Sequence, residues 1–241
     1  MVPRFYADEP LRAGGICRLQ EDTAHHAVHV LRIRAGDEIT LFNGRGGEYR
    51  ARVAAIDRLR VTVDILEFRD VERESPLRMI LVQGVSAGER MDFTIRKAVE
   101  LGVAEVRPVL AATSVARPKG ERAAARQAHW QKIAIAACEQ CGRNLVPVVH
   151  ALVAAEDYKD QNEGLKIILS PRAGLRFSQA CKEASERVTL AAGPEAGFNA
   201  EEEAVFLDAG FVPVSLGPRI LRTETAALAA LAALSALRGD F

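Results

Sequence analysis

Three segments rich in glycine and proline are the most unusual features of this chain, and each follows a short apolar run. They are residues 170–174, after Leu169; residues 193–197, with the sequence Gly-Pro-Glu-Ala-Gly; and residues 217–226, after Leu216. Glycine lets backbone amides and carbonyls approach a ligand closely, and proline stiffens a loop so that less entropy is lost on binding. Each segment alone is weak evidence, because Gly-Pro after a strand is most often a turn. Together they indicate a ligand site at the ends of strands.

Two common phosphate-binding patterns are missing from the sequence. There is no Gly-x-x-x-x-Gly-Lys-Ser/Thr, and no Gly-x-Gly-x-x-Gly stands between a strand and a helix. Nucleoside triphosphate and dinucleotide chemistry therefore lose their best support.

The elements that must position these loops begin after Pro76, where continuous apolar runs alternate with helical periodicity. The runs cover residues 79–82, 106–110, 146–149, 165–169, 188–191 and 212–216. The helical stretches cover residues 91–101, 123–141, 177–184 and 200–207, and a last one begins near Thr223. Short runs that are apolar throughout and separated by helices predict a parallel sheet covered on both faces. In such sheets ligands bind beyond the carboxyl ends of the strands, which is where the three loops lie.

The first 70 or so residues have a different pattern. Residues 38–42 and 49–53 alternate between apolar and polar types on either side of the glycine-rich turn 43–47, and residues 59–65 form a further alternating run. They predict a small, mostly antiparallel β domain. Residues 69–76 are charged, have no periodicity and end in proline, so we place a boundary there and expect domains at 1–74 and 75–241.

Composition narrows the class of protein. The 241 residues are 49% hydrophobic and 27% charged, which excludes a mainly disordered chain, and 32 basic side chains balance 32 acidic ones. A nucleic-acid partner must therefore meet a local basic patch. Residues 76–150 hold 11 basic and 6 acidic side chains. The four cysteines are scattered, and the sequence has no signal-peptide pattern and no apolar run long enough to span a bilayer. We therefore expect a soluble, cytoplasmic protein that does not associate with a membrane.

Residues 193–197, followed by residues 216–226, closely resemble the paired carboxyl-terminal motifs of the bacterial 16S rRNA uridine-N3 methyltransferases of the SPOUT superfamily. Nearly the whole chain is covered, because further landmarks of that family occur in the expected order. They are residues 3–6, 29–32 before Gly36-Asp37, 90–103, and 139–143 with Pro147. One departure is Ala196, where the family usually has glycine. A methyl group is tolerable there unless the backbone needs a positive φ.

The resemblance implies a fold and a cofactor. We expect an α/β, trefoil-knotted SPOUT methyltransferase domain with a parallel sheet, preceded by a small PUA-like β-barrel that helps to hold RNA. It also implies a homodimer, S-adenosyl-L-methionine as cofactor, and no metal. Carried over to this sequence, the cofactor-binding residues are Leu169, Gly193, Pro194, Glu195, Gly197, Leu216, Gly217, Ile220, Leu221, Arg222, Thr225 and Ala226.

The chemistry of such a reaction sets further requirements. N3 of uridine carries a proton at neutral pH and lies between two carbonyls, so methylation needs loss of that proton and stabilisation of the charge on O2 and O4. An arginine could stabilise the anion, and the matched segments offer Arg4, Arg143 and Arg222. Glu139 or Glu224 could accept the proton through water, and either could equally be an ion-pair partner that orients an arginine.

Other clusters have simpler interpretations. Cys138 and Cys141 have the spacing of a zinc knuckle, but no second pair of ligands lies at a compatible spacing, so we interpret them as packing residues at a helix end. His25 and His29, four residues apart, could bind a metal, but we expect them to pack or to touch RNA backbone.

A basic segment and the last helix each have two possible roles. The basic side chains of Arg117, Lys119, Arg122 and Arg126 fit rRNA phosphate contact and a solvated helix face equally well. The alanine-rich final helix is predicted to be a packing element, whose small side chains would also suit a tight dimer contact.

The resemblance therefore implies methylation of N3 of a uridine in 16S rRNA of the small ribosomal subunit, in its decoding region. The alternatives are a non-catalytic RNA-binding or ribosome-assembly protein on the same fold, and a SPOUT methyltransferase for another RNA position.

Overall fold

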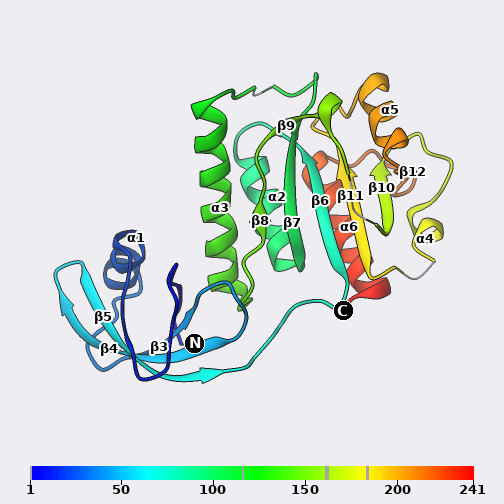
Figure 1. The fold of residues 1–241 in the computed structure, drawn as a ribbon. Helices are drawn as coiled ribbons and strands as arrows, with labels where there is room; N and C mark the ends of the chain where they lie inside the picture. Colours follow the sequence, from blue (N-terminus) through cyan, green and yellow to red (C-terminus); the bar gives the residue numbers. More distant parts are fainter. Residues whose placement is uncertain (1, 116, 161–162, 183–184) are drawn as a thin grey trace. The chain divides into compact units, whose positions relative to one another are not determined.

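The computed structural model describes residues 2–115, 117–160, 163–182 and 185–241. The chain divides into two compact units. Unit 1 comprises Met1–Glu74 and Cys138–Val146, and unit 2 comprises Ser75–Ala137 and Pro147–Phe241. Figure 1 labels most of the helices and strands of both units.

Unit 1 contains a five-stranded sheet with the order β1-β3-β4-β5-β2. Its strands are β1 (Arg4–Tyr6), β2 (Ile16–Arg18), β3 (Glu38–Phe42), β4 (Glu48–Asp57) and β5 (Arg60–Arg69). β1 runs parallel to β3, and the other pairs are antiparallel, so the predicted, mostly antiparallel β domain is confirmed. The short helix α1 (Glu21–His25) and the π-helical turn η1 (His26–Val30) complete the unit.

The β3–β4 turn depends on glycine. Gly44, Gly46 and Gly47 all have positive φ, and a Cβ on Gly47 would lie 2.3 Å from a ring carbon of Phe68. A side chain there would collide with the ring that packs on the hairpin. The positive φ values therefore favour glycine in the turn predicted from the sequence, and a side chain at Gly47 would also have to displace the half-exposed ring of Phe68.

A second stretch of chain belongs to unit 1. The helix α3 (Glu121–Cys141) ends directly before Gly142, whose φ is +91°. The last turn of this helix and the residues after it, Cys138–Val146, belong to unit 1. Asn144 is fully buried and donates a hydrogen bond to the carbonyl of Val71 at 2.6 Å. Unit 1 is therefore assembled from two stretches of sequence. The assignment of separate functions to residues 1–74 and 75–241 stays a prediction.

Unit 2 is built on a parallel sheet with the order β12-β10-β11-β6-β7-β8, and β9 also pairs with β7. Every strand pair in it is parallel, as predicted. Its strands are β6 (Arg78–Gly84), β7 (Val103–Leu110), β8 (Val148–Val149), β9 (Val153–Ala154), β10 (Leu165–Leu169), β11 (Arg187–Ala192) and β12 (Val212–Val214). The last is shorter than the predicted strand over 212–216.

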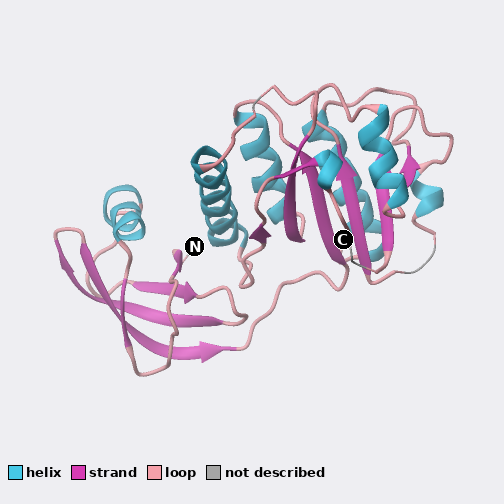
Figure 2. Ribbon diagram, turned by 45° about the horizontal axis from the view of Figure 1, so that its top comes forward, coloured by secondary structure: helices cyan, strands magenta, loops and turns pink. Residues whose placement is uncertain are grey.

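Helices cover both faces of this sheet (Figure 2), which confirms the second part of the prediction. α2 (Glu89–Glu100) and α6 (Thr223–Arg238) pack against each other and against β7, β6 and β11. α5 (Ala200–Asp208) and the 3-10 turn η2 (Ala155–Asp157) cover the opposite face around Phe206. α4 (Phe177–Ala180) falls within the helix predicted over 177–184, of which residues 183 and 184 lie outside the described residues.

The alanine-rich helix α6 is a packing element, as predicted. Ala227, Ala230, Leu231 and Leu234 are fully buried. The small side chains of Ala227 and Ala230 let the helix approach the sheet closely.

An ion cluster at one end of β7 links three elements of unit 2. The carboxylate of Glu105 accepts hydrogen bonds from Arg78 Nη2 at 2.6 Å and Arg107 Nη2 at 2.8 Å, and its Oε2 lies 2.9 Å from His150 Nε2. Burial raises the pKa of Glu105, but the two arginines outweigh that effect and lower the pKa to about 2. The ionised form is therefore favoured by the folded state.

We expect Glu105→Gln to lower the free energy of unfolding by about 2 kcal/mol at pH 7. This value is smaller than the pKa shift alone would give, because solvent around Arg78 weakens its ion pair with Glu105. Because the folded-state pKa is depressed, this contribution is complete above about pH 4.5 and is lost as the pH falls toward 2. Urea unfolding of both proteins across this range measures it. Glu163→Gln, an exposed carboxylate, is the control. A difference between wild type and Glu105→Gln that does not change with pH would contradict the assignment.

Candidate functional site

The three glycine- and proline-containing loops lie at one edge of the sheet in unit 2. They follow β10, β11 and β12, which are neighbouring parallel strands, so their carboxyl ends point the same way. Main-chain hydrogen bonds join the first loop to the end of β12, from which the third loop continues: Ser170 N–H donates to Val214 O at 2.9 Å, and Ser215 N–H donates to Leu175 O at 2.9 Å. The structure thus brings together the segments that hold all twelve predicted cofactor-binding residues.

The loop after β11 is a tight turn whose shape needs Gly193. Gly197 N–H donates to Pro194 O at 2.9 Å, and Gly197 has a φ of +76°. A Cβ on Gly193 would lie 2.9 Å from the Cα of Gly197, closer than real Cβ contacts allow. Gly193 is therefore glycine because the backbone packs against itself, and not only because of turn preference.

Ala196 in the same loop causes no strain. The described non-glycine residues with positive φ are Arg32 and Arg58, so Ala196 has an ordinary backbone conformation. The alanine that departs from the family pattern is compatible with the geometry of the turn.

Gly217, in the loop after β12, is glycine for a different reason. Its φ is +109°, and a Cβ there would meet nothing within 4 Å. The position is conformationally demanding but open, which leaves its main-chain groups accessible to a ligand.

A buried glutamine fixes the loops to each other, and our sequence reasoning missed it. The fully buried Gln83 at the end of β6 donates from Nε2 to Thr223 Oγ1 at 3.0 Å, and Thr223 Oγ1 donates to Gly193 O at 2.5 Å. The loop after β11 is thereby tied to the first residue of α6. A polar residue directly after the apolar run of residues 79–82 was the available signal.

Glu195 ties the same loop to the segment after β6. Its Oε1 accepts hydrogen bonds from Ala87 N–H at 3.0 Å and Arg90 Nη1 at 2.9 Å. Burial raises the pKa of Glu195, but these hydrogen bonds outweigh it and hold the pKa below its usual value. Glu195 is an ionised, anchored side chain that positions the loop.

The beginning of α6 presents the groups suited to chemistry. Arg222 is exposed and is the N-cap residue of the helix, and Ile220 before it is 86% exposed. Oε2 of Glu224 is buried and has no hydrogen-bond partner among the described residues. An exposed cation, an exposed apolar side chain and a buried carboxylate oxygen thus occur within five residues.

The other predicted catalytic residues lie in unit 1, where Arg4 is held by several groups. It donates from Nη1 to Glu48 Oε2 at 2.5 Å and from Nη2 to Asn144 Oδ1 at 2.8 Å, and it lies 5.0 Å from the ring centre of Phe42. Its side chain is 12% exposed. Arg4 therefore joins β1 to the second stretch of unit 1.

Arg143 and Glu139 come from that second stretch. Arg143 is buried and pairs with Glu74 through two hydrogen bonds, one of them from Nε at 2.9 Å. Burial lowers the pKa of Arg143, but Glu74 outweighs it and raises the pKa. Glu139 accepts the Tyr6 N–H at 2.9 Å, and burial raises the pKa of Glu139. All three unit 1 candidates are thus engaged with neighbours, whereas Arg222, in unit 2, is exposed.

The cysteine and histidine pairs show no metal-like arrangement. Cys138 is buried, its Sγ donates to Leu145 O at 3.6 Å, and burial raises the pKa of its thiol to about 12. The rings of His25 and His29 lie with their centres 4.6 Å apart and their planes tilted by 47°. In the part of the chain that the structure describes, no three His, Cys, Asp or Glu side chains form a group that could hold a metal ion.

No helix among the described residues is long and apolar enough to cross a membrane.

Family models match both parts of the chain. Residues 73–235 match an RNA methyltransferase domain, and residues 19–66 match an RNA methyltransferase PUA domain. The predicted PUA-like domain is therefore confirmed as a family assignment.

Curated relatives share one name, "Ribosomal RNA small subunit methyltransferase E". The protein of this name from Buchnera aphidicola is 33% identical over 100% of this chain and 95% of its own length. The one from Bacillus subtilis is 31% identical over 91% of both.

Two solved structures are similar over the whole of both chains. A ribosomal RNA small subunit methyltransferase E from Neisseria gonorrhoeae, bound to S-adenosylmethionine, is 40% identical with a TM-score of 0.91. A methyltransferase from Legionella pneumophila, in complex with the same cofactor, is 37% identical with a TM-score of 0.93. The chain thus belongs to the ribosomal RNA small subunit methyltransferase E family, and it is an S-adenosylmethionine-dependent methyltransferase of ribosomal RNA.

Proposed function

We propose that this enzyme methylates N3 of a uridine in 16S rRNA, in the decoding region of the small subunit. The observation that supports this most directly is the position of the exposed Arg222, which lies in the loop after β12 and is the N-cap residue of α6. A cation at that place can meet the negative charge that develops on the oxygens beside N3.

Incubation with labelled S-adenosylmethionine tests the proposal. The substrates are 16S rRNA, either free or within small subunits, from a strain that lacks this enzyme. Digestion and mass spectrometry should find 3-methyluridine at one site. Methylation of another atom or of a different RNA would reject the proposal.

The three loops fit an adenosyl cofactor. Gly217 offers open main-chain groups, Gly197 has positive φ with free space around it, and Ile220 supplies an exposed apolar side chain. We propose that the twelve residues named from the sequence hold S-adenosylmethionine. Gly193 and Glu195 set the shape of the loop after β11. When bound, the cofactor supplies the methyl group as an electrophile.

The chain's own side chains then have to manage charge and a proton. Methylation forms the N3–C bond and breaks the methyl–sulfur bond, while the N3 proton must leave. We propose that the guanidinium of Arg222 stabilises the charge on the uracil oxygens. The carboxylate of Glu224 accepts the proton through water, because its Oε2 lacks a partner among the described residues and lies two residues from Arg222.

The contacts of Arg4, Arg143 and Glu139 support a positioning role. Each is already paired inside unit 1, with Glu48, Glu74 and Tyr6 N–H respectively. We propose that they hold the second stretch of unit 1 on its sheet. Direct contact of any of them with the uracil stays a prediction.

The trefoil knot is also proposed. The chain leaves the edge strand β12 and returns as α6 to pack on β11 and β6, which lie further inside the sheet. Such a return past the loop after β11 suits a threaded chain. A crystal structure in which the backbone forms no knot would contradict the proposal.

We propose a homodimer, and sedimentation at micromolar concentration should show a species near twice 26.2 kDa. Exposed apolar side chains in unit 2 support it: Ile220 is 86% exposed, Leu237 52% and Phe241 70%. Ile220→Asp should shift the species toward the monomer. An active wild-type enzyme that sediments only as a monomer would contradict the proposal. A cytoplasmic location stays a prediction.

A further inference from the structure

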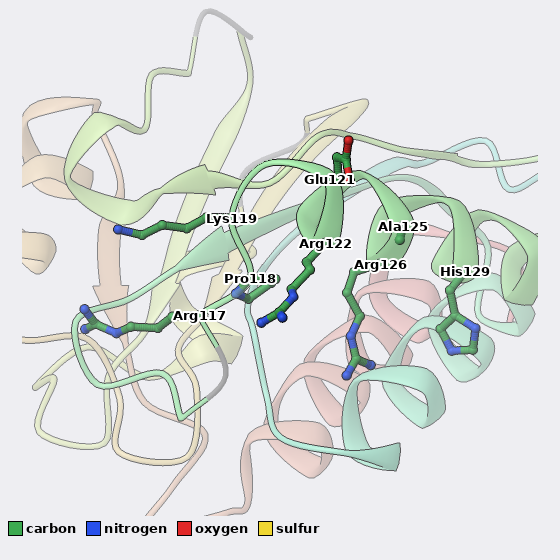
Figure 3. A pocket seen from close by; sticks show the side chains of 8 residues that line it. All are labelled: Arg117, Pro118, Lys119, Glu121, Arg122, Ala125, Arg126 and His129. Carbon is green, nitrogen blue, oxygen red and sulfur yellow. The ribbon is translucent and has the colours of Figure 1, made fainter.

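Unit 2 carries a basic hollow of about 1030 Å³ where the loop before α3 meets the first turns of that helix (Figure 3). We call it the basic hollow and define its cations as Arg117, Lys119, Arg122 and Arg126. His129 also lines it, and Glu121 is the carboxylate among its lining residues. The chain as a whole has no net charge, so this local excess is a specific feature of the surface.

The helix presents its basic side chains together. Arg122, Arg126 and His129 are spaced four and three residues apart and project from the same side of α3, whereas Glu121 points to the other side (Figure 3). All four cations of the hollow belong to exposed residues. His129 Nε2 pairs with Asp92 at 2.8 Å, so the nearby carboxylate of α2 is already engaged.

The hollow is connected to the proposed cofactor loop through the segment after β7. Arg117 donates to the carbonyl oxygen of Ala112. The next residue, Thr113, donates from Oγ1 to Gly197 O at 2.7 Å. A ligand held by Arg117 would thus sit on the same structural support as the glycine loop after β11.

A second connection runs through the segment after β6. Arg126 and Trp130 line a small cavity together with Ser86 and Gly88. The residue between them, Ala87, donates its N–H to Glu195 in the glycine loop. Two independent contacts therefore join the basic hollow to the turn where we place the cofactor.

We infer that the basic hollow binds phosphates of the RNA substrate and holds the strand beside the cofactor loops. The inference rests on the proposed function, which it deepens by assigning a site to the RNA backbone. Arginine and lysine neutralise phosphates in a sequence-independent way, and such contacts position a strand without reading its bases. RNA phosphate fits better than a protein partner because four of the eight residues that line the hollow are exposed arginine or lysine, against one carboxylate.

The test compares Arg122→Ala/Arg126→Ala with Arg96→Ala, which removes an exposed arginine from helix α2 of the same unit. Binding of 16S rRNA transcribed in vitro is measured at several salt concentrations. The double variant should lose about tenfold in affinity, and the slope of log K against log salt should fall by about 1.4 to 1.8. Arg96→Ala should bind as the wild type does. The loss should be equal for an RNA of scrambled sequence.

Two further readouts separate the outcomes. S-adenosylmethionine binding by calorimetry and the methylation rate at saturating RNA should be unchanged, so the defect appears in KM and not in kcat. Unchanged RNA affinity and salt slope in the double variant would overturn the inference and show a solvated helix face. Loss of cofactor binding or a change in sedimentation would overturn it too, in favour of a cofactor or subunit contact. A wild-type enzyme that methylates no 16S rRNA would instead defeat the proposed function.

Discussion

Gly193→Val should abolish S-adenosylmethionine binding, with a loss of at least 100-fold in affinity, while the protein stays folded. A Cβ at this position would lie 2.9 Å from the Cα and 3.0 Å from the carbonyl carbon of Gly197, and backbone atoms cannot rotate away as a flexible side chain can. The turn must open, and the Gly193 carbonyl would leave Thr223 Oγ1. The site loses its preorganised shape, which is where main-chain recognition obtains its affinity. Calorimetric titration measures the loss.

Two other substitutions in the loops after β11 and β12 distinguish the effect of a steric clash from the effect of backbone strain. Ala196→Gly should leave affinity unchanged, because Ala196 already has an ordinary φ. Gly217→Ala should weaken binding less than Gly193→Val, since its φ of +109° strains alanine but no atom stands in the way. Circular dichroism confirms that each variant is folded. If Gly193→Val is folded and binds S-adenosylmethionine as the wild type does, the loop after β11 is not part of the cofactor site.

Local patterns predicted six of the seven strands in the sheet of unit 2, all but β9, and the positions of the loops after β10, β11 and β12. Each apolar run became a strand because burial on both faces demands continuous apolar sequence, and each helix filled the interval between runs. The ends were less accurate. β7 begins at Val103, three residues before the predicted start, because Gly102 ends α2 and Val103 at once pairs with Met79.

Long-range polar pairs could not be predicted in this way. The second stretch of unit 1 is held by Asn144 against Arg4 and Val71, and by Arg143 against Glu74. These partners are about 70 to 140 residues apart, and a single buried pair leaves no periodicity. Arg4 and Arg143 are catalytic candidates because they lie in segments that match the family, and their carboxylate partners, Glu48 and Glu74, could not be predicted from the sequence. Removing residues 1–74 would leave this stretch without its packing, so point variants are the better tests of unit 1.

The buried link from Gln83 to Thr223 illustrates the same limit at the site. Glycine and proline reveal where a loop is, because their backbone preferences are local. The hydrogen bonds that fix one loop against another join residues 140 positions apart. The loops could thus be found from the sequence, but what holds them together could not.

Arg222→Ala should reduce the rate of methyl transfer by about 10²- to 10³-fold, the range typical for loss of one group that stabilises a developing anion. Arg222 is exposed at the start of α6 and has no carboxylate partner among the ion pairs of the described residues, so its charge is available to a uracil oxygen. The Arg222 side chain makes no cap hydrogen bond to α6, so we expect Arg222 to contribute to the cofactor site through its main chain, which the substitution keeps. Affinity for S-adenosylmethionine should therefore stay within a few-fold of wild type, and the loss should appear in kcat at saturating RNA.

Arg219→Ala is the matched control, because it removes an exposed arginine from the same loop. If bulk positive charge near the loop were what mattered, both variants would lose RNA affinity in parallel and neither would lose kcat. Arg222→Lys should recover only part of the rate, since an ammonium keeps the charge but lacks the planar pair of donors that can face a carbonyl. A full rate in Arg222→Ala at saturating RNA would exclude Arg222 as the group that stabilises the anion. The guanidinium would then have to come from Arg4 or Arg143, each of which would first have to leave its partner in unit 1, Glu48 or Glu74.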